Sequence, residues 1–473
     1  MYRIVFNNRG AVVESWILKG YDDIQENPLE LVNEKAFNTA GKPFSVEFTG
    51  ENPGDVNQAL FVAKPADDGL SISFEWTSGG VSATKAFRFE KSSYVVEVNS
   101  EIRRNGGRIP HLLAWRGGFG DETIPSYVSG LQTVYSPRNS SSIEVKSAGD
   151  VDDAPVTDRG AFDFAGIQDQ YFALLALDPK NAELELKSVA DNVTTRINPE
   201  PELHAGIAVG SPAGNDLRFF IGPKKLDVLE KVNPELASIV DFGWFWFIAR
   251  PLFEALQWMV SNWIPTWGWS IVILTIAINF VLLPLKLTSL RSMKKMQALQ
   301  PQIAAINEKY KGVSLRDPKK QQQNQEMMAL YQKHGVNPLG GCLPMVLQIP
   351  FFFAFYKVLN VAIELRGADW LWVTDLSQPE QIPIRVLPLT MMASQFFMQK
   401  MTPSPSTDPA QQKVMMLMPF MFGIMFYSIS SGLVLYWLTS NLVGIAQQLL
   451  INKFSPPVQV AQPETKAAGK RRK

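Results

Sequence analysis

The sequence is poor in the residue types that carry catalysis and metal binding. It has one cysteine and three histidines among 473 residues. Cys342 lies in an apolar run, where a small packed residue is expected rather than a nucleophile. His111 and His204 show no metal-ligand spacing, and Glu202 with His204 lies in a stretch expected to form a surface turn. The sequence therefore predicts no metal, no cofactor, no small-molecule substrate and no enzyme activity, and it disfavours a sandwich enzyme of the sugar-epimerase type.

Carboxylates are missing from the longest apolar stretches. Between Trp267 and Ile363, every aspartate and glutamate lies in the charged segment 286–333. Ion-coupled transporters and pumps usually place ionisable side chains along their path through the membrane. The sequence also shows no internal repeat, which many transporters have. A small-solute transporter or channel with an exported ligand-binding domain is thus the less favoured alternative.

Long apolar runs are absent from the first half of the chain and frequent in the second. A helix rises 1.5 Å per residue, so about 20 apolar residues cross the roughly 30 Å hydrocarbon layer. Five runs predict five transmembrane helices: Trp267–Leu285, Leu339–Leu365, Arg385–Met401, Val414–Ile429 and Leu433–Leu450. We assign residues 266–454 to this membrane core and residues 455–473 to a basic tail.

Charge divides the chain in the same way. Residues 1–237 carry 23 basic and 34 acidic side chains, whereas residues 238–473 carry 22 and 11. Basic residues mark cytoplasmic loops. The segment 286–333 holds ten of them and the tail ends in Lys470–Lys473, whereas the segment 364–385 has four acids against two arginines. This pattern predicts a cytoplasmic C-terminus and an acidic first domain on the outside.

Residues 1–237 read as an all-β domain. Apolar and polar residues alternate in Ile72–Trp76, Ala86–Phe89 and Tyr94–Val98, with turn clusters such as Ser78–Gly80 between them. The length favours a large antiparallel sandwich. Because Met1 leads directly into a strand-like sequence, whereas an exported domain needs a signal or anchor helix, we expect an N-terminal anchor helix to be missing from this chain.

Tryptophans gather in residues 238–265, between the two halves. Trp244, Trp246, Trp258 and Trp263 are typical of the headgroup level of a membrane. The polar sequence around Arg250 makes a full crossing improbable, so we expect Pro251–Asn262 to form a helix in the outer interface. A simple linker is the alternative.

Residues 287–335 predict a cytoplasmic helical hairpin. Leu290, Met293, Leu299, Ile303 and Ile306 recur at helical spacing before a break at Gly312–Pro318. The charges on the polar faces are explained either by attraction to anionic lipid or by docking of an RNA-rich partner such as a ribosome. The lysines concerned are Lys294, Lys295, Lys309, Lys311, Lys319 and Lys320.

Polar side chains recur at helical spacing inside the apolar runs. Buried amides are costly in lipid unless they bond to one another or to water. Interhelical hydrogen bonding explains each one singly, but polar faces on four helices favour a water-accessible groove. The groove candidates are Thr275, Asn279 and Lys286 on the first run, Gln348 on the second, Gln395 on the third and Asn441 on the last.

Methionine is concentrated near the end of the chain. Nine of the sixteen lie within Met391–Met425. Flexible thioethers suit a surface that accepts many apolar shapes, although core packing is the commoner use of any one of them.

Several motifs resemble one known family. They are Asn337–Pro344 (NPLGGCLP), Gln348–Pro350 (QIP), Met293–Pro301 (MKKMQALQP), Gln168–Phe172 (QDQYF) and Ser431–Trp437 (SGLVLYW). Together they resemble the YidC/Oxa1/Alb3 family of membrane protein insertases in its Gram-negative form, over essentially the whole chain. The resemblance implies an outer β-supersandwich, a five-helix core around a hydrophilic groove open to the cytoplasm and lipid, and a location in the bacterial inner membrane.

The resemblance also implies an activity, partners and residue roles. Such proteins insert and help to fold nascent membrane proteins, alone or with the Sec translocon (SecYEG, SecDF), and anionic lipid and the ribosome are further expected partners. The client helix would slide along Ile349, Pro350, Phe352, Met425 and Trp437. The family usually has a groove arginine where this chain has Asn279. We therefore expect a weaker attraction for acidic client tails, or one shared with Lys286.

Overall fold

The computed structural model describes residues 1–125, 129–138, 140, 142–177, 183–212, 214–313, 317–336, 343–401 and 409–454. They form two compact units, Met1–Asp241 and Phe242–Lys473, which we call the β unit and the helical unit. The boundary falls just after the predicted one at residue 237. The reason is that η4 (Pro234–Ile239) packs on α3 (Leu226–Val232) within the β unit and buries Leu236 and Ile239.

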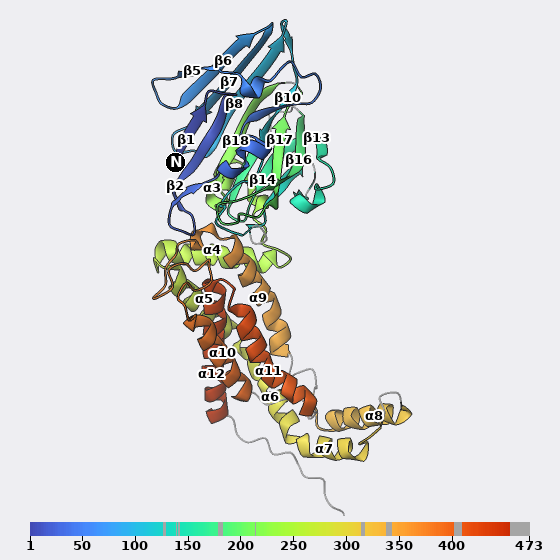
Figure 1. Cartoon of the computed structure of the whole chain (residues 1–473). Helices are drawn as coiled ribbons and strands as arrows, with labels where there is room; N and C mark the ends of the chain where they lie inside the picture. The colour runs from blue at the N-terminus through green and yellow to red at the C-terminus, as the bar shows by residue number, and fades with distance from the viewer. Residues whose placement is uncertain are drawn as a thin grey trace, which may run out of the picture. The chain divides into compact units, whose positions relative to one another are not determined.

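The β unit contains three antiparallel sheets (Figure 1). The smallest is β1 (Tyr2–Asn7), β2 (Val12–Asp22) and β3 (Pro28–Glu30). The second runs in the order β13 (Val156–Gly160), β16 (Leu184–Val193), β17 (Glu202–Gly210), β10 (His111–Trp115) and β4 (Ser45–Phe48). The largest runs β12 (Glu144–Ser147), β11 (Gln132–Pro137), β14 (Phe162–Gln168), β15 (Phe172–Leu177), β18 (Asn215–Pro223), β8 (Val95–Arg104), β7 (Val81–Phe89), β6 (Ser71–Ser78) and β5 (Val62–Pro65), with β9 (Gly107–Arg108) on β8.

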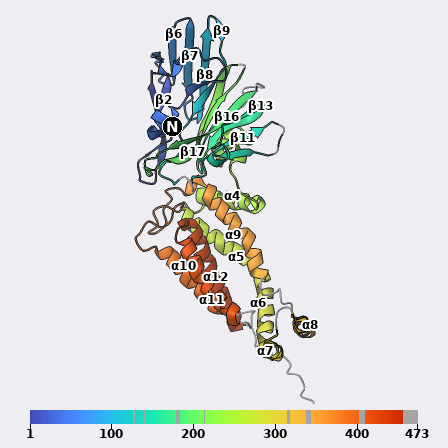
Figure 2. The same ribbon diagram turned by 45° about the vertical axis from the view of Figure 1, so that its right-hand side comes forward.

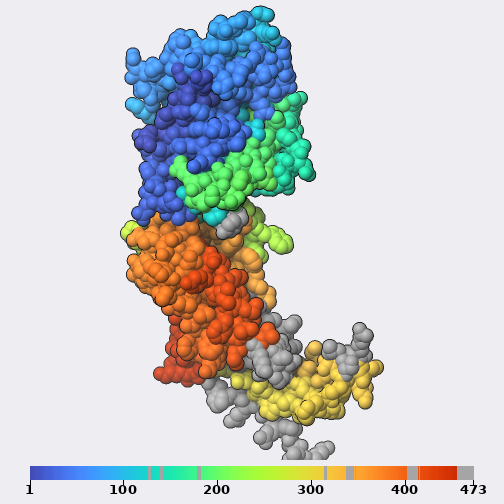
Figure 3. All heavy atoms as spheres, viewed as in Figure 1, coloured from blue at the N-terminus to red at the C-terminus, as the bar shows by residue number. Residues whose placement is uncertain are grey.

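The predicted all-β character of this unit is confirmed. The three alternating stretches fall in β6, in β7 and at the start of β8. On β7 the inward positions Val81, Ala83 and Phe87 are buried, as the period of two requires. Short helices fill the connections: η1 (Glu34–Ala36), α1 (Phe37–Ala40), η2 (Val56–Gln58) and η3 (Ala148–Asp150). Figure 3 shows one face of the β unit, coloured blue to green.

One inward position of β7 is a lysine. Lys85 is 2% exposed, and its ammonium donates to the main-chain carbonyls of Gly10 at 3.1 Å and Phe44 at 2.7 Å. Burial lowers the pKa of Lys85 to about 7. The alternation that places Phe87 inward also predicts an inward Lys85, because the two residues differ by one period.

Both histidines of the β unit are buried. The His111 ring bonds to the Ser100 hydroxyl at 2.8 Å through Nε2 and to the Ile109 carbonyl at 3.0 Å through Nδ1. Burial lowers the pKa of each histidine. The prediction of a surface turn through His204 was wrong, since β17 begins at Glu202 and its register turns His204 into the interior.

The helical unit contains both apolar and polar helices (Figure 2). Their bounds are α4 (Trp246–Asn262), α5 (Trp267–Val281), α6 (Leu283–Ala298), α7 (Gln300–Lys309), α8 (Pro318–Lys333), α9 (Leu343–Val361), η6 (Ile363–Leu365), α10 (Val386–Met401), α11 (Pro409–Phe426) and α12 (Ser431–Phe454). Among the described residues, α12 has the length and composition of a membrane span. The pair α5 and α6, bent by 58°, passes the same test as a single broken span.

Two helices differ from the prediction in their bounds. Helix α4 begins at Trp246 rather than at Pro251, because Ala249 continues the buried face formed by Leu252, Phe253 and Leu256. The first apolar run breaks at Leu282, next to Pro284, whose missing N–H cannot continue the hydrogen-bond ladder of α5.

Packing within the helical unit centres on α12. It lies beside α10 and α5, and α10 also packs on α11 (Figures 1 and 2). The Phe355 ring of α9 stacks on Tyr436 of α12 with centroids 4.2 Å apart. A small apolar core joins α6, α7 and α8 and consists of Met296, Leu299, Ile303 and Val336, with Met327, Leu330 and Tyr331 of α8 against it.

Candidate functional site

Polar side chains of α5, α9 and α12 meet at Ser440. The Asn279 amide donates to the Thr275 carbonyl at 2.8 Å and reaches the Ser440 hydroxyl at 3.5 Å. The Gln348 amide donates to the same hydroxyl at 3.2 Å. Thr275, Asn279 and Ser440 are each at most 5% exposed. The structure thus brings three of the predicted groove residues together around a serine that the sequence interpretation did not single out.

Lys286 joins this cluster from the far side of the bend. Its ammonium donates to the Asn279 side-chain oxygen at 2.6 Å. The helix break at Leu282 turns α6 but leaves the lysine within reach of α5. No described residue forms an ion pair with Lys286, which is partly buried. We call this group the Asn279 cluster (Thr275, Asn279, Lys286, Gln348 and Ser440). In it the ammonium of Lys286 is held against one neutral oxygen atom, that of the Asn279 side chain.

The two remaining groove candidates lie on a second contact, between α10 and α12. The Trp437 indole donates to the Gln395 side-chain oxygen at 3.1 Å, and the Asn441 amide donates to the Ser394 hydroxyl at 3.0 Å. Asn441 and Ser394 are buried. These bonds join two helices directly. For Gln395 and Asn441 the contact is therefore interhelical hydrogen bonding of the kind considered from the sequence.

Aromatic rings cluster on α9, α11 and α12 next to these contacts. Phe352 lies 4.9 Å from the Trp437 ring and 6.3 Å from Phe426, which lies 5.2 Å from Trp437. Ile349 and Met425 are 40% and 49% exposed. Pro350, which is partly exposed, lies inside α9 without ending it. The predicted slide residues thus include packed rings as well as exposed aliphatic side chains.

The predicted lysine surface of α6–α8 is exposed or half-exposed. Lys309 pairs with Glu326 at 2.5 Å, and Lys311 pairs with Glu308 at 2.9 Å. Exposed pairs of this kind contribute little to stability, and the ion pairs leave the surface basic. Lys294, Lys295, Lys319 and Lys320 form no ion pair within the described part of the chain.

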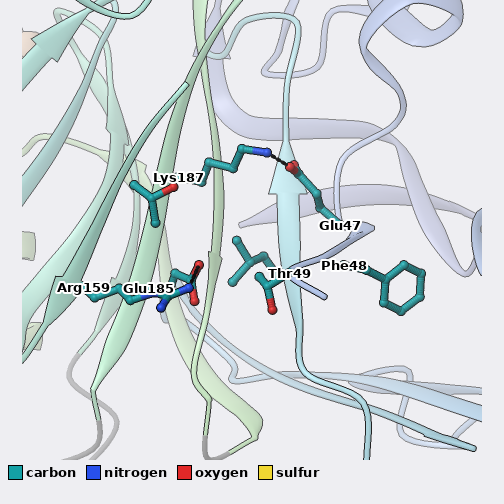
Figure 4. A pocket seen from close by; sticks show the side chains of 8 residues that line it. Glu47, Phe48, Thr49, Arg159, Glu185 and Lys187 are labelled. Carbon is teal, nitrogen blue, oxygen red and sulfur yellow. Dashed lines mark hydrogen bonds and ion pairs between the residues drawn. The ribbon is translucent and has the colours of Figure 1, made fainter. Parts of the chain in front are cut away.

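A hollow of about 510 Å³ lies in the β unit, on the five-stranded sheet (Figure 4). Lys187 of β16 pairs with Glu47 of β4, and Arg159 of β13 pairs with Glu185 of β16 at 2.9 Å. These charges neutralise one another, so the hollow presents no net charge to a ligand. Cys342 and the motif 337–342 lie outside the described residues.

Comparison with known proteins agrees with this organisation. Residues 1–255 match the family model described as the YidC periplasmic domain, and residues 259–458 match the 60Kd inner membrane protein family. The Membrane protein insertase YidC of Ralstonia nicotianae is 35% identical over 95% of this chain and 81% of its own length. That of Geobacter sp. is 33% identical over 96% and 84%.

A solved structure, an active YidC insertase with its first transmembrane domain resolved, covers 96% of this chain and 91% of its own at 18% identity and a TM-score of 0.40. The fold and the family matches define a two-part protein, with a large β-sheet domain followed by a helical membrane-protein domain. The chain belongs to the YidC family of bacterial membrane protein insertases.

Proposed function

We propose that this chain is a membrane protein insertase and chaperone without covalent chemistry. It moves short hydrophilic client segments through a polar groove at the Asn279 cluster and releases their apolar helices into lipid. The observation that carries the proposal is Lys286, an ammonium held by an amide with no ion-pair partner among the described residues. A cation and amides beside apolar helices can hydrate a polar segment, and they shorten its path through hydrocarbon.

The proposed topology follows the charge pattern. The helical unit crosses the bacterial inner membrane five times, the β unit lies in the periplasm, and the α6–α8 hairpin and the basic tail 455–473 lie in the cytoplasm. Helix α4 lies in the outer interface, supported by the 91% exposure of Trp244 and the 53% exposure of Trp258.

The client helix leaves along the apolar slide. Ile349 and Met425 supply exposed aliphatic surface, and the rings of Phe352 and Trp437, 4.9 Å apart, supply packed aromatic surface. The methionine Met421, which is 63% exposed on the same helix as Met425, suits clients of different shape. Nascent membrane proteins are thus the primary partners. Anionic lipid, the ribosome and the Sec translocon are further proposed partners, the first two through the lysine surface.

Complementation tests this function. The host insertase is depleted while this chain is expressed, both as it stands and behind an export helix, and protease accessibility follows a small client with one short translocated segment. We expect translocation to be restored. The Asn279→Leu variant should reduce it strongly, because the groove then has an apolar side chain and Lys286 loses its acceptor.

A matched pair of threonines separates the groove from general damage. Thr275 and Thr390 both donate to the carbonyl four residues earlier, but Thr275 is buried in the cluster and Thr390 is exposed. Thr275→Val should reduce translocation and Thr390→Val should not. Equal effects of the two changes, or a stably inserted chain that restores nothing, would count against a groove at this place.

A further inference from the structure

The loop between α9 and α10 contains a tight turn with an apolar tip. Trp370 and Val373 exchange both main-chain hydrogen bonds, at 2.8 and 2.9 Å, so that the turn between them is tight. The two residues at its tip are Leu371, 63% exposed, and Trp372, 44% exposed. Turn tips usually carry glycine, asparagine or other small polar residues, so two large apolar side chains at this position need an explanation.

The backbone shows that this exposure is imposed by the fold. Leu371 has a φ of +53°, a left-handed conformation that a leucine adopts only at a cost. The turn directs the side chain away from the rest of the loop instead of burying it. The structure therefore holds a strained residue with its apolar surface outward.

Contacts with the starts of α10 and α5 also hold the turn in place. The Trp372 indole donates at 2.6 Å to Glu380, whose other oxygen accepts from the Leu387 amide at the start of α10 at 2.7 Å. Trp370 lies directly on α5, since a Cβ placed on Gly268 would come within 2.2 Å of its ring. Because the polar atom of Trp372 is satisfied, only apolar ring surface is left for an occupant.

The turn continues a cluster of aromatic rings that begins on α5, with the buried Trp370 between two exposed tryptophans. The Trp269 ring lies 5.5 Å from Trp370, which lies 5.9 Å from Trp372. Trp269 is 45% exposed in the first turn of α5, at the end of the apolar run. Tryptophan prefers the headgroup level of a bilayer, where its ring is apolar and its N–H is satisfied.

We propose that the Leu371–Trp372 tip is a lipid anchor, inserted into the headgroup layer of the outer leaflet beside α5. The proposal rests on the topology given under the proposed function, in which the 363–385 loop faces outward. The anchor would fix the depth of the loop and of the first turn of α5, because Trp370 connects the two.

Depth-dependent quenching of the full chain in lipid nanodiscs tests the anchor. In a Cys342→Ser background, cysteines at Leu371, at Gln381 and at Ile424 each carry an environment-sensitive fluorophore. Gln381 is an exposed polar position of the same loop, and Ile424 is 78% exposed on α11. Nitroxide lipids place the quencher at the headgroup, at a shallow acyl position or at a deep one.

The expected result is that headgroup and shallow quenchers quench the Leu371 probe several-fold more than the Gln381 probe, while deep quenchers act on the Ile424 probe. Iodide quenching of Leu371 equal to that of Gln381 would place the tip in water and overturn the proposal. Protection from both iodide and lipid quenchers would show that a protein covers the tip, which also overturns it. If the deep quenchers did not act on the Ile424 probe, the transmembrane assignment of α11 would instead be contradicted, so the two failures are distinguishable.

Discussion

Lys85 of the β unit and Lys286 of the helical unit both donate hydrogen bonds from their ammonium groups to neutral oxygens. Within the described residues neither lysine forms an ion pair. Lys85 has two main-chain acceptors and is 2% exposed, whereas Lys286 has one side-chain acceptor and is partly exposed. The main-chain carbonyls of Gly10 and Phe44, which lie in turns, are held by the backbone, whereas the amide side chain of Asn279 can rotate. The number and rigidity of the acceptors therefore decide whether a buried cation is a permanent part of the core or can be shared with a passing anion.

The largest expected effect is the loss of stability when Lys85 and its two fixed acceptors are separated. Lys85→Ala leaves the carbonyls of Gly10 and Phe44 without a donor and opens a cavity, so the β unit should lose ~3 kcal/mol or more of stability. Hydrogen exchange of β7 in the full chain measures the loss. Lys64→Ala is the matched control, since Lys64 is exposed in its pair with Glu75 and should change stability by less than ~0.5 kcal/mol. Unchanged protection of β7 in Lys85→Ala would show that Lys85 is dispensable.

The pH dependence of stability comes next. The pKa of Lys85 is about 7 in the folded chain and 10.5 as its ordinary value, so the unfolded state binds more protons between these values. Stability should therefore rise from pH 7 to pH 9, by at most ~1.4 kcal/mol per pH unit from this group, and the penalty is fully present below pH 7. Lys85→Met should remove this contribution. If the chain and the variant show parallel pH profiles, the buried amine does not titrate as expected.

Substitution of Lys286 in the Asn279 cluster should change the insertion of client proteins more than the stability of the chain. Lys286→Ala should lower insertion of a client with an acidic tail about tenfold, which corresponds to ~1.4 kcal/mol, and should affect a neutral-tailed client less. Lys286→Arg should restore it, because the charge remains. Asn279→Arg tests whether the lack of an arginine at this position weakens the attraction for acidic client tails. Unchanged insertion of the acidic-tailed client in this variant would show that it does not.

The smallest effect concerns a fixed anion in the helical unit. Glu380 is 2% exposed and accepts from the Trp372 indole and the Leu387 amide. Glu380→Gln keeps one acceptor and removes the charge at the start of α10, so thermal unfolding should show a loss of ~1 kcal/mol. Glu254→Gln, at an exposed helix position paired with Arg250, is the control. An equal loss of stability in both variants would show that the two hydrogen bonds of Glu380 do not stabilise the helical unit more than an exposed ion pair does.

The sequence predicted the β and helical units because each depends on a repeated local signal. Alternation marked β6, β7 and β8, and apolar runs marked helices, of which α12 and the broken pair α5 and α6 have the length and composition of a span. The convergence on Ser440 was not predicted, because a serine in an apolar helix has no distinguishing pattern and its neighbours Asn279 and Gln348 come from distant parts of the chain. The bend at Leu282 also escaped prediction, although Pro284 was a local signal for it.

The 363–385 loop also joins helices that are not neighbours in sequence. Its carbonyls at Leu376 and Gln378 accept from the amides of Gly432 and Ser431 at the start of α12, at 2.9 and 2.7 Å. Glu380 binds the start of α10, and Trp370 rests on the start of α5. The loop thus joins the starts of three helices, and nearer the other end of α5 the Gln447 amide of α12 donates to the Asn279 carbonyl at 3.2 Å. A displacement of the 363–385 loop would therefore be transmitted to the starts of α5, α10 and α12 together.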